Sequence, residues 1–228
     1  MIFLVLGRGK TGTVVADVAA QRGHSVRVIG EEENPNASAL TGPMLAQFDT
    51  VIDFTTPQAV IPNMRACLAN GARMVVGTTG WYDKLPDVRA ICERRNGALV
   101  YGASFSVGVQ VMYRLVQQLL PMVPGFEISI SETHHESKKD KPSGTALTLK
   151  RILLEVDPAL KVEIVSHRQG EEVGIHTITA RLGDDVIQIR HESLSRRSFA
   201  EGAVQAAEWL CGRTGCYDFR EIYPQLRQ

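Results

Sequence analysis

Residues 132–147, ETHHESKKDKPSGTAL, combine side chains that could do acid–base chemistry. His134 and His135 are adjacent, Lys138 follows three residues later, and a Pro-Ser-Gly-Thr turn leads into an apolar pattern. Histidine titrates near neutral pH and can deliver a proton. Lysine can pair with a carboxylate, stabilise developing negative charge or donate a proton. Such a loop is either a solvated surface turn or a pocket that holds an anion and moves a proton.

The end of this loop has the pattern of a helix start. Ser143 is a good N-cap for a helix that opens at Thr145, and the amides of Gly144 and Thr145 would then form an anion site. The same turn could also be only a cap. Lys139 and Lys141 are expected to be ordinary surface charges. The coincidence of an acid, a cation and a helix start in one loop favours a functional site that holds substrate.

A glycine-rich turn near the N-terminus predicts a dinucleotide site. Its residues are Gly7, Arg8, Gly9, Lys10, Thr11 and Gly12. The turn directly follows an all-apolar strand and opens a helical pattern, which is the context this fingerprint requires. Its glycines permit a tight turn, a close approach to the pyrophosphate and close helix–sheet packing. A glycine turn that binds nothing is the structural alternative.

The cofactor is predicted to be NAD or NADP. Glu31 ends the second strand, where a carboxylate can accept hydrogen bonds from the adenosine ribose and would repel a 2′-phosphate. This favours NADH. Arg8 and Lys10 leave NADPH open, because either could pair with that phosphate, and Glu31 could also be one charge of a solvated acidic run.

Two further turns at predicted strand ends could line the nicotinamide. They comprise Gly77, Thr78 and Thr79, and Ala103, Ser104, Phe105 and Ser106. Ligands bind at the carboxyl ends of strands in open α/β sheets. Each segment by itself could be merely a turn.

The elements that position these residues form two domains. Predicted strands alternate with helices over residues 1–106, which indicates an α/β fold with a doubly wound, Rossmann-type parallel sheet. These strands are expected at residues 2–6, 25–30, 50–56, 73–80 and 98–106. After residue 125, strands with period-two alternation surround one helix, which predicts a second, α+β domain with a mixed or antiparallel sheet. Residues 199–212 return to helical spacing.

Composition excludes several classes of protein. The 228 residues carry 25 basic and 25 acidic side chains, so no overall field favours nucleic acid or an anionic membrane. No stretch is long enough to span a membrane. The four cysteines have no metal-knuckle spacing, so no metal site is expected, and reduced thiols suit a cytoplasmic protein.

The loop, with the pattern E-x-H-H-x-x-K-x-D-x-P-S-G-T-A, resembles the signature of the 4-hydroxy-tetrahydrodipicolinate (dihydrodipicolinate) reductase family. The resemblance continues through GRGKTG, VIDFTTP, VVGTTGW, ASFSVGV, SHRQGEEVGIHT and SRRSFAEGAV, and so spans nearly the whole chain. It implies NAD(P)H-dependent reduction, with loss of water, of a cyclic dicarboxylate in the diaminopimelate route to lysine.

The resemblance also implies an organisation and residue roles. A dinucleotide-binding domain of residues 1–106 would be completed by 196–228, and residues 107–195 would bind substrate and build a homotetramer. His134 would donate the proton, and Lys138 would be the second acid and cation. The substrate would be held by His135, Ser143, Gly144, Thr145 and Arg196.

Some positions depart from the family pattern. Glu32 stands where many members have an arginine, which again favours NADH. Ser104 replaces a common asparagine, and the segment between Glu31 and Asp49 is shorter than in many members. Two alternatives remain at this point: another Rossmann dehydrogenase of amino-acid metabolism, or a non-catalytic NAD-responsive module.

Overall fold

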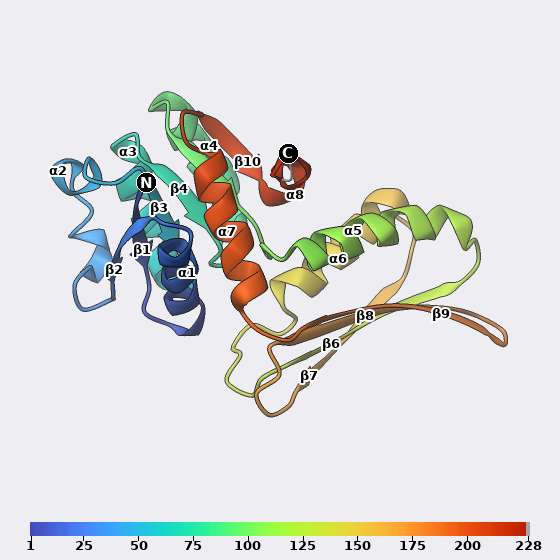
Figure 1. The fold of residues 1–228 in the computed structure, drawn as a ribbon. Helices are drawn as coiled ribbons and strands as arrows, with labels where there is room; N and C mark the ends of the chain where they lie inside the picture. The colour runs from blue at the N-terminus through green and yellow to red at the C-terminus, as the bar shows by residue number, and fades with distance from the viewer. Residues whose placement is uncertain (227–228) are drawn as a thin grey trace. The chain divides into compact units, whose positions relative to one another are not determined.

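The computed structural model describes residues 1–226, which form two compact units. The first unit contains residues 1–106 and the chain after residue 195, and the second contains residues 107–195. In Figure 1 the first unit is coloured blue to green and red, and the second unit is coloured green to orange. Within the described residues, no helix has the length and apolar character needed to cross a membrane.

The first unit is built on a six-stranded parallel sheet in the order β10-β5-β4-β3-β1-β2, which confirms the predicted Rossmann-type fold. Its first part contains β1 (Ile2–Leu6), α1 (Lys10–Gln21), β2 (Ser25–Ile29), α2 (Gly42–Leu45), β3 (Thr50–Asp53), α3 (Pro57–Ala69), β4 (Arg73–Val76), α4 (Leu85–Arg94) and β5 (Ala98–Tyr101). Its last part contains α7 (Arg197–Trp209), β10 (Gly215–Asp218) and α8 (Phe219–Ile222). The edge strand β10 was not predicted.

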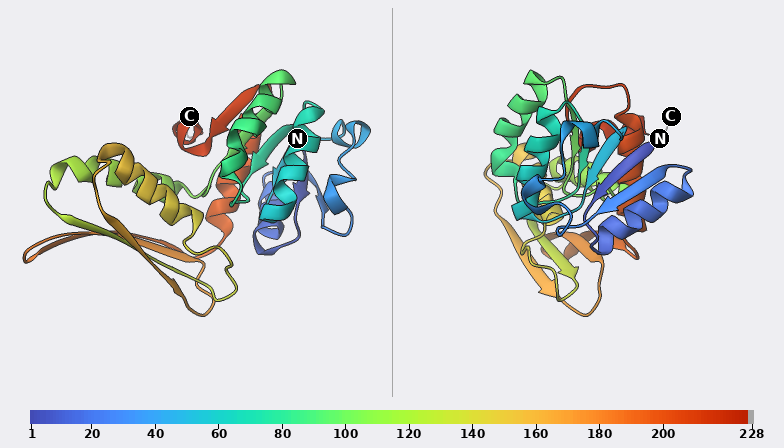
Figure 2. Two further views of the ribbon diagram at one scale, coloured as in Figure 1. Left: turned by 180° about the vertical axis from the view of Figure 1, so that it is seen from behind. Right: turned by 90° about the vertical axis from the view of Figure 1, so that its left-hand side faces the viewer.

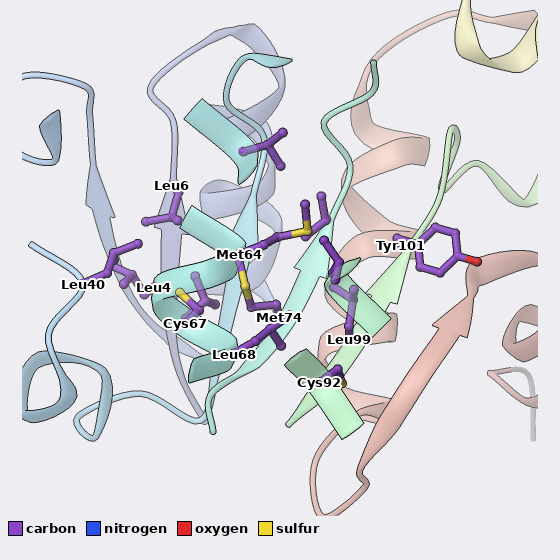
Figure 3. Packing of buried hydrophobic residues seen from close by; sticks show 14 of the residues in the cluster. Leu4, Leu6, Leu40, Met64, Cys67, Leu68, Met74, Cys92, Leu99 and Tyr101 are labelled. Carbon is purple, nitrogen blue, oxygen red and sulfur yellow. The ribbon is translucent and has the colours of Figure 1, made fainter. Parts of the chain in front are cut away.

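The central strands β1, β3, β4 and β5 are buried almost throughout, so both faces of the sheet are covered there. On one face Leu4 and Leu6 pack with Met64 and Leu68 of α3, which Figure 3 shows in close-up. On the other face the Thr50 hydroxyl donates to the main-chain oxygen of Ala207 at 3.4 Å, so α7 covers that side together with α1.

The second unit has a four-stranded mixed sheet in the order β7-β6-β8-β9, as predicted. Its elements are α5 (Val107–Leu119), β6 (Glu127–His134), α6 (Gly144–Val156), β7 (Val162–Arg168), β8 (Gly174–Leu182) and β9 (Asp185–Ser193). β6 runs parallel to β7 and antiparallel to β8. Figure 2 shows α5 and α6 side by side against the sheet.

The inner face of β6 changes character along the strand. Ile128 and Ile130 pack with α5 and α6 in an apolar core. Because side chains alternate across a strand, the next two residues on this face are Glu132 and His134, and both are buried. The strand therefore carries a carboxylate and an imidazole beyond the end of an apolar core.

Candidate functional site

A cavity of about 420 Å³ opens at the carboxyl end of β1 in the first unit. Its lining comes from the turn after β1, the segment after β2 and the segment after β3, and includes Gly7, Arg8, Gly9, Glu31, Asn36 and Thr55. A volume of this size suits a nucleotide-sized ligand.

The turn after β1 requires glycine and leaves room for a phosphate. A Cβ on Gly7, where φ is +105°, would lie 2.4 Å from the Phe54 carbonyl oxygen, and one on Gly12 would lie 2.1 Å from the Gly7 oxygen. Around Gly9 an added Cβ would meet no atom within 4 Å. Helix α1 begins without a side-chain cap, and the amides of Thr11 and Gly12 have no acceptor inside the helix. The turn therefore fits the pyrophosphate of a dinucleotide.

Arg8 is held by an acidic residue to which sequence reasoning gave no role. Its Nη2 lies 2.7 Å from Glu33 Oε2 and donates to the Val28 oxygen at 3.3 Å. Glu33 also accepts the Gly30 amide at 2.9 Å. That amide and the Arg8 cation hold the pKa of Glu33 below its usual value. Glu31, in contrast, is exposed and lines the cavity.

A buried carboxylate fixes the turns at the ends of β3 and β4. Asp53 accepts hydrogen bonds from the Thr55 hydroxyl at 2.7 Å, the Asn63 amide group at 2.9 Å and the Thr78 hydroxyl at 2.8 Å. Burial raises the pKa of Asp53, and these donors oppose the shift. A Cβ on Gly77 would lie 2.2 Å from the Phe54 ring. The hydroxyl of Thr78 thus faces Asp53 and holds this turn in place.

Thr79 and residues 103–106 follow β4 and β5 at the same edge of the sheet, apart from the lining of the cavity. Phe105 is buried, with its ring centroid 4.5 Å from that of Phe219. Ser104 and Ser106 are also buried, and the Ser104 hydroxyl oxygen accepts the Ser106 amide at 3.3 Å. The Phe105 ring is a core side chain, so this residue can meet a cofactor only through its main chain.

The second unit holds a buried polar cluster at the end of β6. Glu132, His134 and His176 are 1%, 6% and 4% exposed. Glu132 and His176 are cross-strand partners on β6 and β8. Glu132 Oε2 lies 3.6 Å from His134 Nδ1 and 3.7 Å from His176 Nε2. One carboxylate oxygen therefore faces two imidazoles.

Arg168, at the end of β7, ties the acid loop to this carboxylate. Its guanidinium nitrogens lie 3.4 Å from Glu132 Oε1. It also donates to the main-chain oxygens of Lys138 at 3.4 Å and Asp140 at 2.5 Å. The Lys138 ammonium pairs with Asp140 Oδ1 at 2.6 Å. The loop is thus anchored by its main chain, and Lys138 remains partly exposed.

Helix α6 begins at the end of the loop, with Ser143 as its N-cap, as predicted. The Ser143 hydroxyl oxygen accepts the Ala146 amide at 3.2 Å. The Ser143 amide donates to both oxygens of Glu132, at 3.0 and 3.2 Å. The amides of Gly144 and Thr145 have no acceptor inside the helix, so they can bind an anion. The acid candidate and the anion site are therefore linked through Glu132.

The other predicted residues take simpler positions. His135 is half-buried, and its Nδ1 lies 2.8 Å from the Ser137 hydroxyl. Lys139 and Lys141 are exposed. Arg196 belongs to the first unit and directly precedes α7.

Both buried imidazoles are harder to protonate than a free histidine. Burial, with the Lys138 cation, lowers the pKa of His134 to about 4, although Glu132 opposes the shift. Burial, with the neighbouring His134, lowers the pKa of His176 to about 3. Both rings are therefore neutral at pH 7 when no ligand is bound.

Glu132, His134 and His176 also bring metal-ligating atoms within 4.8 Å of one another among residues 1–226. The Arg168 guanidinium beside Glu132 opposes a further cation there. The arrangement consequently suits proton transfer better than metal binding.

Both parts of the chain match models of one protein family. Residues 2–105 match the model described as "Dihydrodipicolinate reductase, N-terminus", and residues 108–223 match "Dihydrodipicolinate reductase, C-terminus". The chain belongs to the dihydrodipicolinate reductase family. The family predicted from the acid-loop signature is thereby confirmed.

Curated relatives extend this assignment over the full length of the chain. The 4-hydroxy-tetrahydrodipicolinate reductase of Christiangramia forsetii is 35% identical, with 99% of each chain covered. The protein of the same name from Natronomonas pharaonis is 34% identical, over 96% of this chain and 98% of its own. Among solved structures, the dipicolinate-bound dihydrodipicolinate reductase from Paenisporosarcina sp. TG-14 has a TM-score of 0.74 and 22% identity, covering 97% of this chain and 99% of its own. That structure shares the fold.

Sequence reasoning for this dihydrodipicolinate reductase family member gave no role to Glu132, His176 or Arg168. A signal for Glu132 was present, because it lies two residues from His134 on a strand whose inner face was already predicted. His176 and Arg168 lie on other strands, and only the pairing of β6 with β8 and β7 brings them to Glu132.

Proposed function

We propose that this protein reduces 4-hydroxy-tetrahydrodipicolinate to tetrahydrodipicolinate, with loss of water, in the diaminopimelate route to lysine. The two curated relatives are named for this activity, and this chain matches them over nearly their whole length. The observation that carries the proposal is the buried His134–Glu132 pair beside the start of α6, because it joins a proton donor to an anion site.

The proposed substrate is a cyclic dicarboxylate, as is the dipicolinate bound in the Paenisporosarcina enzyme. The Gly144 and Thr145 amides would bind one carboxylate, and the half-buried His135 would assist. Ser143 holds these amides through its cap hydrogen bond. Arg196 would help to position the substrate.

His134 is the proposed donor of the proton to the ring carbon beside the one that receives hydride. Because its pKa is lowered, His134 is neutral before the substrate binds. The two carboxylates of the bound substrate would favour the charged imidazole, so His134 would take up its proton when the substrate binds. Lys138 would be the second acid and the cation that stabilises negative charge; its ion pair with Asp140 orients the ammonium group.

The cofactor, NADH or NADPH, would supply the hydride when bound. In the first unit, Gly7, Gly9 and Gly12 would hold the pyrophosphate, with Lys10 and Thr11 in the same turn. We propose NADH as the preferred form, because Glu31 lines the cavity and Arg8 is already paired with Glu33. Residues 77–79 and 103–106 would support the nicotinamide.

The proposed assembly is a homotetramer built through the second unit. Its helices α5 and α6 pack on one face of the sheet, around Ile130 and Ile178. The opposite face carries Ser131, Thr177 and Thr179, side chains that can pair with a second sheet. Light scattering at four times the mass of one chain would support this assembly. A cytoplasmic location is likewise proposed, and it is supported by four cysteines that are all free thiols.

The decisive experiment follows NADH or NADPH oxidation at 340 nm, with substrate generated from pyruvate and aspartate semialdehyde by the preceding synthase. We expect oxidation that depends on both the synthase and this protein. Absence of a rate with either cofactor would reject the proposal. Tight cofactor binding without turnover would instead favour a non-catalytic NAD-responsive module, and turnover of an amino acid would favour another Rossmann dehydrogenase.

His134→Gln tests the proposed acid. We expect kcat to fall roughly 10²-fold or more, because general acid catalysis contributes about 10²–10⁴-fold. NADH binding, measured by fluorescence, should not change. An unchanged kcat would remove His134 from this role.

A further inference from the structure

Glu132 occupies a position that neither the substrate nor the cofactor is expected to reach. Its side chain is completely buried, and its two oxygens are divided between partners. Oε1 faces Arg168 at 3.4 Å, and Oε2 faces His134 and His176 at 3.6 and 3.7 Å. Both oxygens accept the Ser143 amide.

His134 Nδ1 is buried and makes no standard hydrogen bond, and Glu132 Oε2 lies 3.6 Å from it. This carboxylate oxygen therefore determines whether Nδ1 carries a hydrogen. A carboxylate only accepts hydrogen bonds, and a neutral imidazole carries one N–H. A bare Nδ1 would place a lone pair against a carboxylate in a buried site, which is unfavourable. The Nδ1 of His134 must therefore carry the hydrogen, and Nε2 must be bare until a further proton arrives.

The opposite edge of the ring is kept open by a glycine. A Cβ on Gly174 would lie 3.0 Å from His134 Nε2 and 3.3 Å from its Cδ2. These distances are tighter than most side-chain carbons show, so a side chain at this position would push the ring by a few tenths of an ångström. The fold thus holds Nδ1 toward Glu132 and spares Nε2 from crowding.

We propose that Glu132 is the positioning residue of this site: it fixes His134 as the Nδ1–H tautomer, makes Nε2 the atom that carries the reacting proton, and ties the ring to the start of α6. The catalytic part of this inference rests on the proposed function. The tautomer does not. A carboxylate that orients a catalytic histidine through its second nitrogen is a recurring chemical solution.

Glu132→Gln is a sharp test because it keeps the shape of the side chain. Its amide oxygen can still accept the Ser143 amide, whereas its NH₂ group would replace Oε2 and donate toward His134 Nδ1. The ring proton should then move to Nε2. Nitrogen-15 NMR of histidine-labelled protein, without ligand and near pH 7.5, distinguishes the two tautomers, and His134→Gln assigns the signal among six histidines.

We expect Nδ1–H in the native protein and Nε2–H in Glu132→Gln. Native His134 with its hydrogen on Nε2 would overturn the proposal, and so would an unchanged tautomer in the variant. This readout needs no turnover. If the protein shows no reductase activity but the tautomers behave as expected, the proposed function fails and the positioning of His134 stands.

In the reductase assay, Glu132→Gln should lower kcat about 10- to 100-fold, the usual range for a residue that orients a reacting group. The KM for NADH should be unchanged. Glu136→Gln, an exposed carboxylate in the same loop, is the matched control and should match the native rate.

The pH profile separates positioning from a loss of structure. The charged or titratable groups around His134 are Glu132, Lys138, Arg168, Asp140 and His176. Of these, Glu132 favours the protonated ring, and Asp140 does so less strongly; removal of the Glu132 charge should therefore move the pH at which kcat falls to lower values. A uniform loss of kcat at every pH, with the profile unmoved, would contradict the positioning role.

Discussion

At the scale of single residues, the Arg8–Glu33 pair bears on the proposed preference for NADH over NADPH. Arg8 is the cation nearest to Glu33, at 2.7 Å, and Glu33 is itself held by the Gly30 amide. An NADPH phosphate would have to displace Glu33 from Arg8 in order to use that cation. Arg8 therefore counts less in favour of NADPH than the sequence alone implies.

We predict that Glu33→Gln increases kcat/KM for NADPH about fivefold and leaves NADH nearly unaffected. The expected gain is small because both side chains of the Arg8–Glu33 pair are exposed, and exposed ion pairs are weak. Steady-state rates with both cofactors measure the effect. Asp17→Asn removes an exposed carboxylate that lies outside the cavity lining and is the control; an equal gain in that variant would indicate a general field effect instead.

The lowered pKa of His134 predicts proton uptake on ligand binding. Free His134 has a pKa of about 4, and a bound dicarboxylate should raise it. Between these two values, binding consumes one proton, so affinity for dipicolinate should weaken up to about tenfold for each pH unit of increase. Calorimetry in buffers of different ionisation enthalpy measures the uptake. His134→Gln should bind without it, and uptake that persists in this variant would point to another group.

Prediction from sequence worked well for residues that lie close together in the chain. His134, Lys138 and Ser143 fall within ten positions, and the helix cap among them follows from residue type alone. Glu132 was part of the same signature, but its role depends on His176 and Arg168, which strand pairing brings from 36 to 44 residues away. Arg168 and His176 lie in a segment that matches the family, but the sequence does not show which strands pair and so does not show that these residues meet Glu132.

At the scale of elements, the start of helix α6 links the buried Glu132 cluster to the proposed anion site. Its N-cap Ser143 holds the first turn through Ala146 and is itself held by Glu132. The proposed anion site is therefore anchored by the cap hydrogen bonds.

Ser143→Ala should lower the unfolding free energy by about 1 kcal/mol, the usual cost of losing a cap side chain. It should also weaken dipicolinate binding, because the Gly144 and Thr145 amides lose their anchor. Urea unfolding and calorimetry provide the measurements. Thr41→Ala is the control, since Thr41 caps α2 without a side-chain hydrogen bond. Equal destabilisation by both changes would contradict the cap argument.

The elements themselves were predicted where pattern and length are both clear. The strands expected at 50–56, 73–80 and 98–106 end earlier, at Asp53, Val76 and Tyr101. The residues beyond these ends leave the sheet and form turns, which we propose to be part of the cofactor site. Strand β10 has only four residues and is mostly half-buried, so it carries no apolar signal and is formed by pairing with β5.

At the scale of the whole molecule, the buried histidines make the second unit sensitive to acid. His134 and His176 have pKa values of about 4 and about 3 when folded, against 6.5 in an unfolded chain. Below pH 6.5 the unfolded state binds more protons, so stability is present above that pH and is lost as pH falls toward the folded values.

We predict that the unfolding free energy drops by up to about 1.4 kcal/mol per pH unit for each of these histidines between pH 6.5 and 4. Urea unfolding followed by circular dichroism at several pH values measures this slope. His176→Gln should flatten it, whatever its effect on stability at pH 7.5. A slope that equals the native one would show that His176 does not titrate as its burial requires.

The divided chain of the first unit has a consequence for synthesis. Helix α7 and strand β10 complete a sheet whose other strands end at Tyr101, and the whole second unit is made in between. On the ribosome, the sheet face that α7 later covers and the open edge of β5 stay bare while residues 107–195 emerge and fold. The nascent protein thus exposes an apolar sheet face and an unpaired strand edge through much of its translation. At this stage a chaperone would have the most aggregation-prone surface to cover.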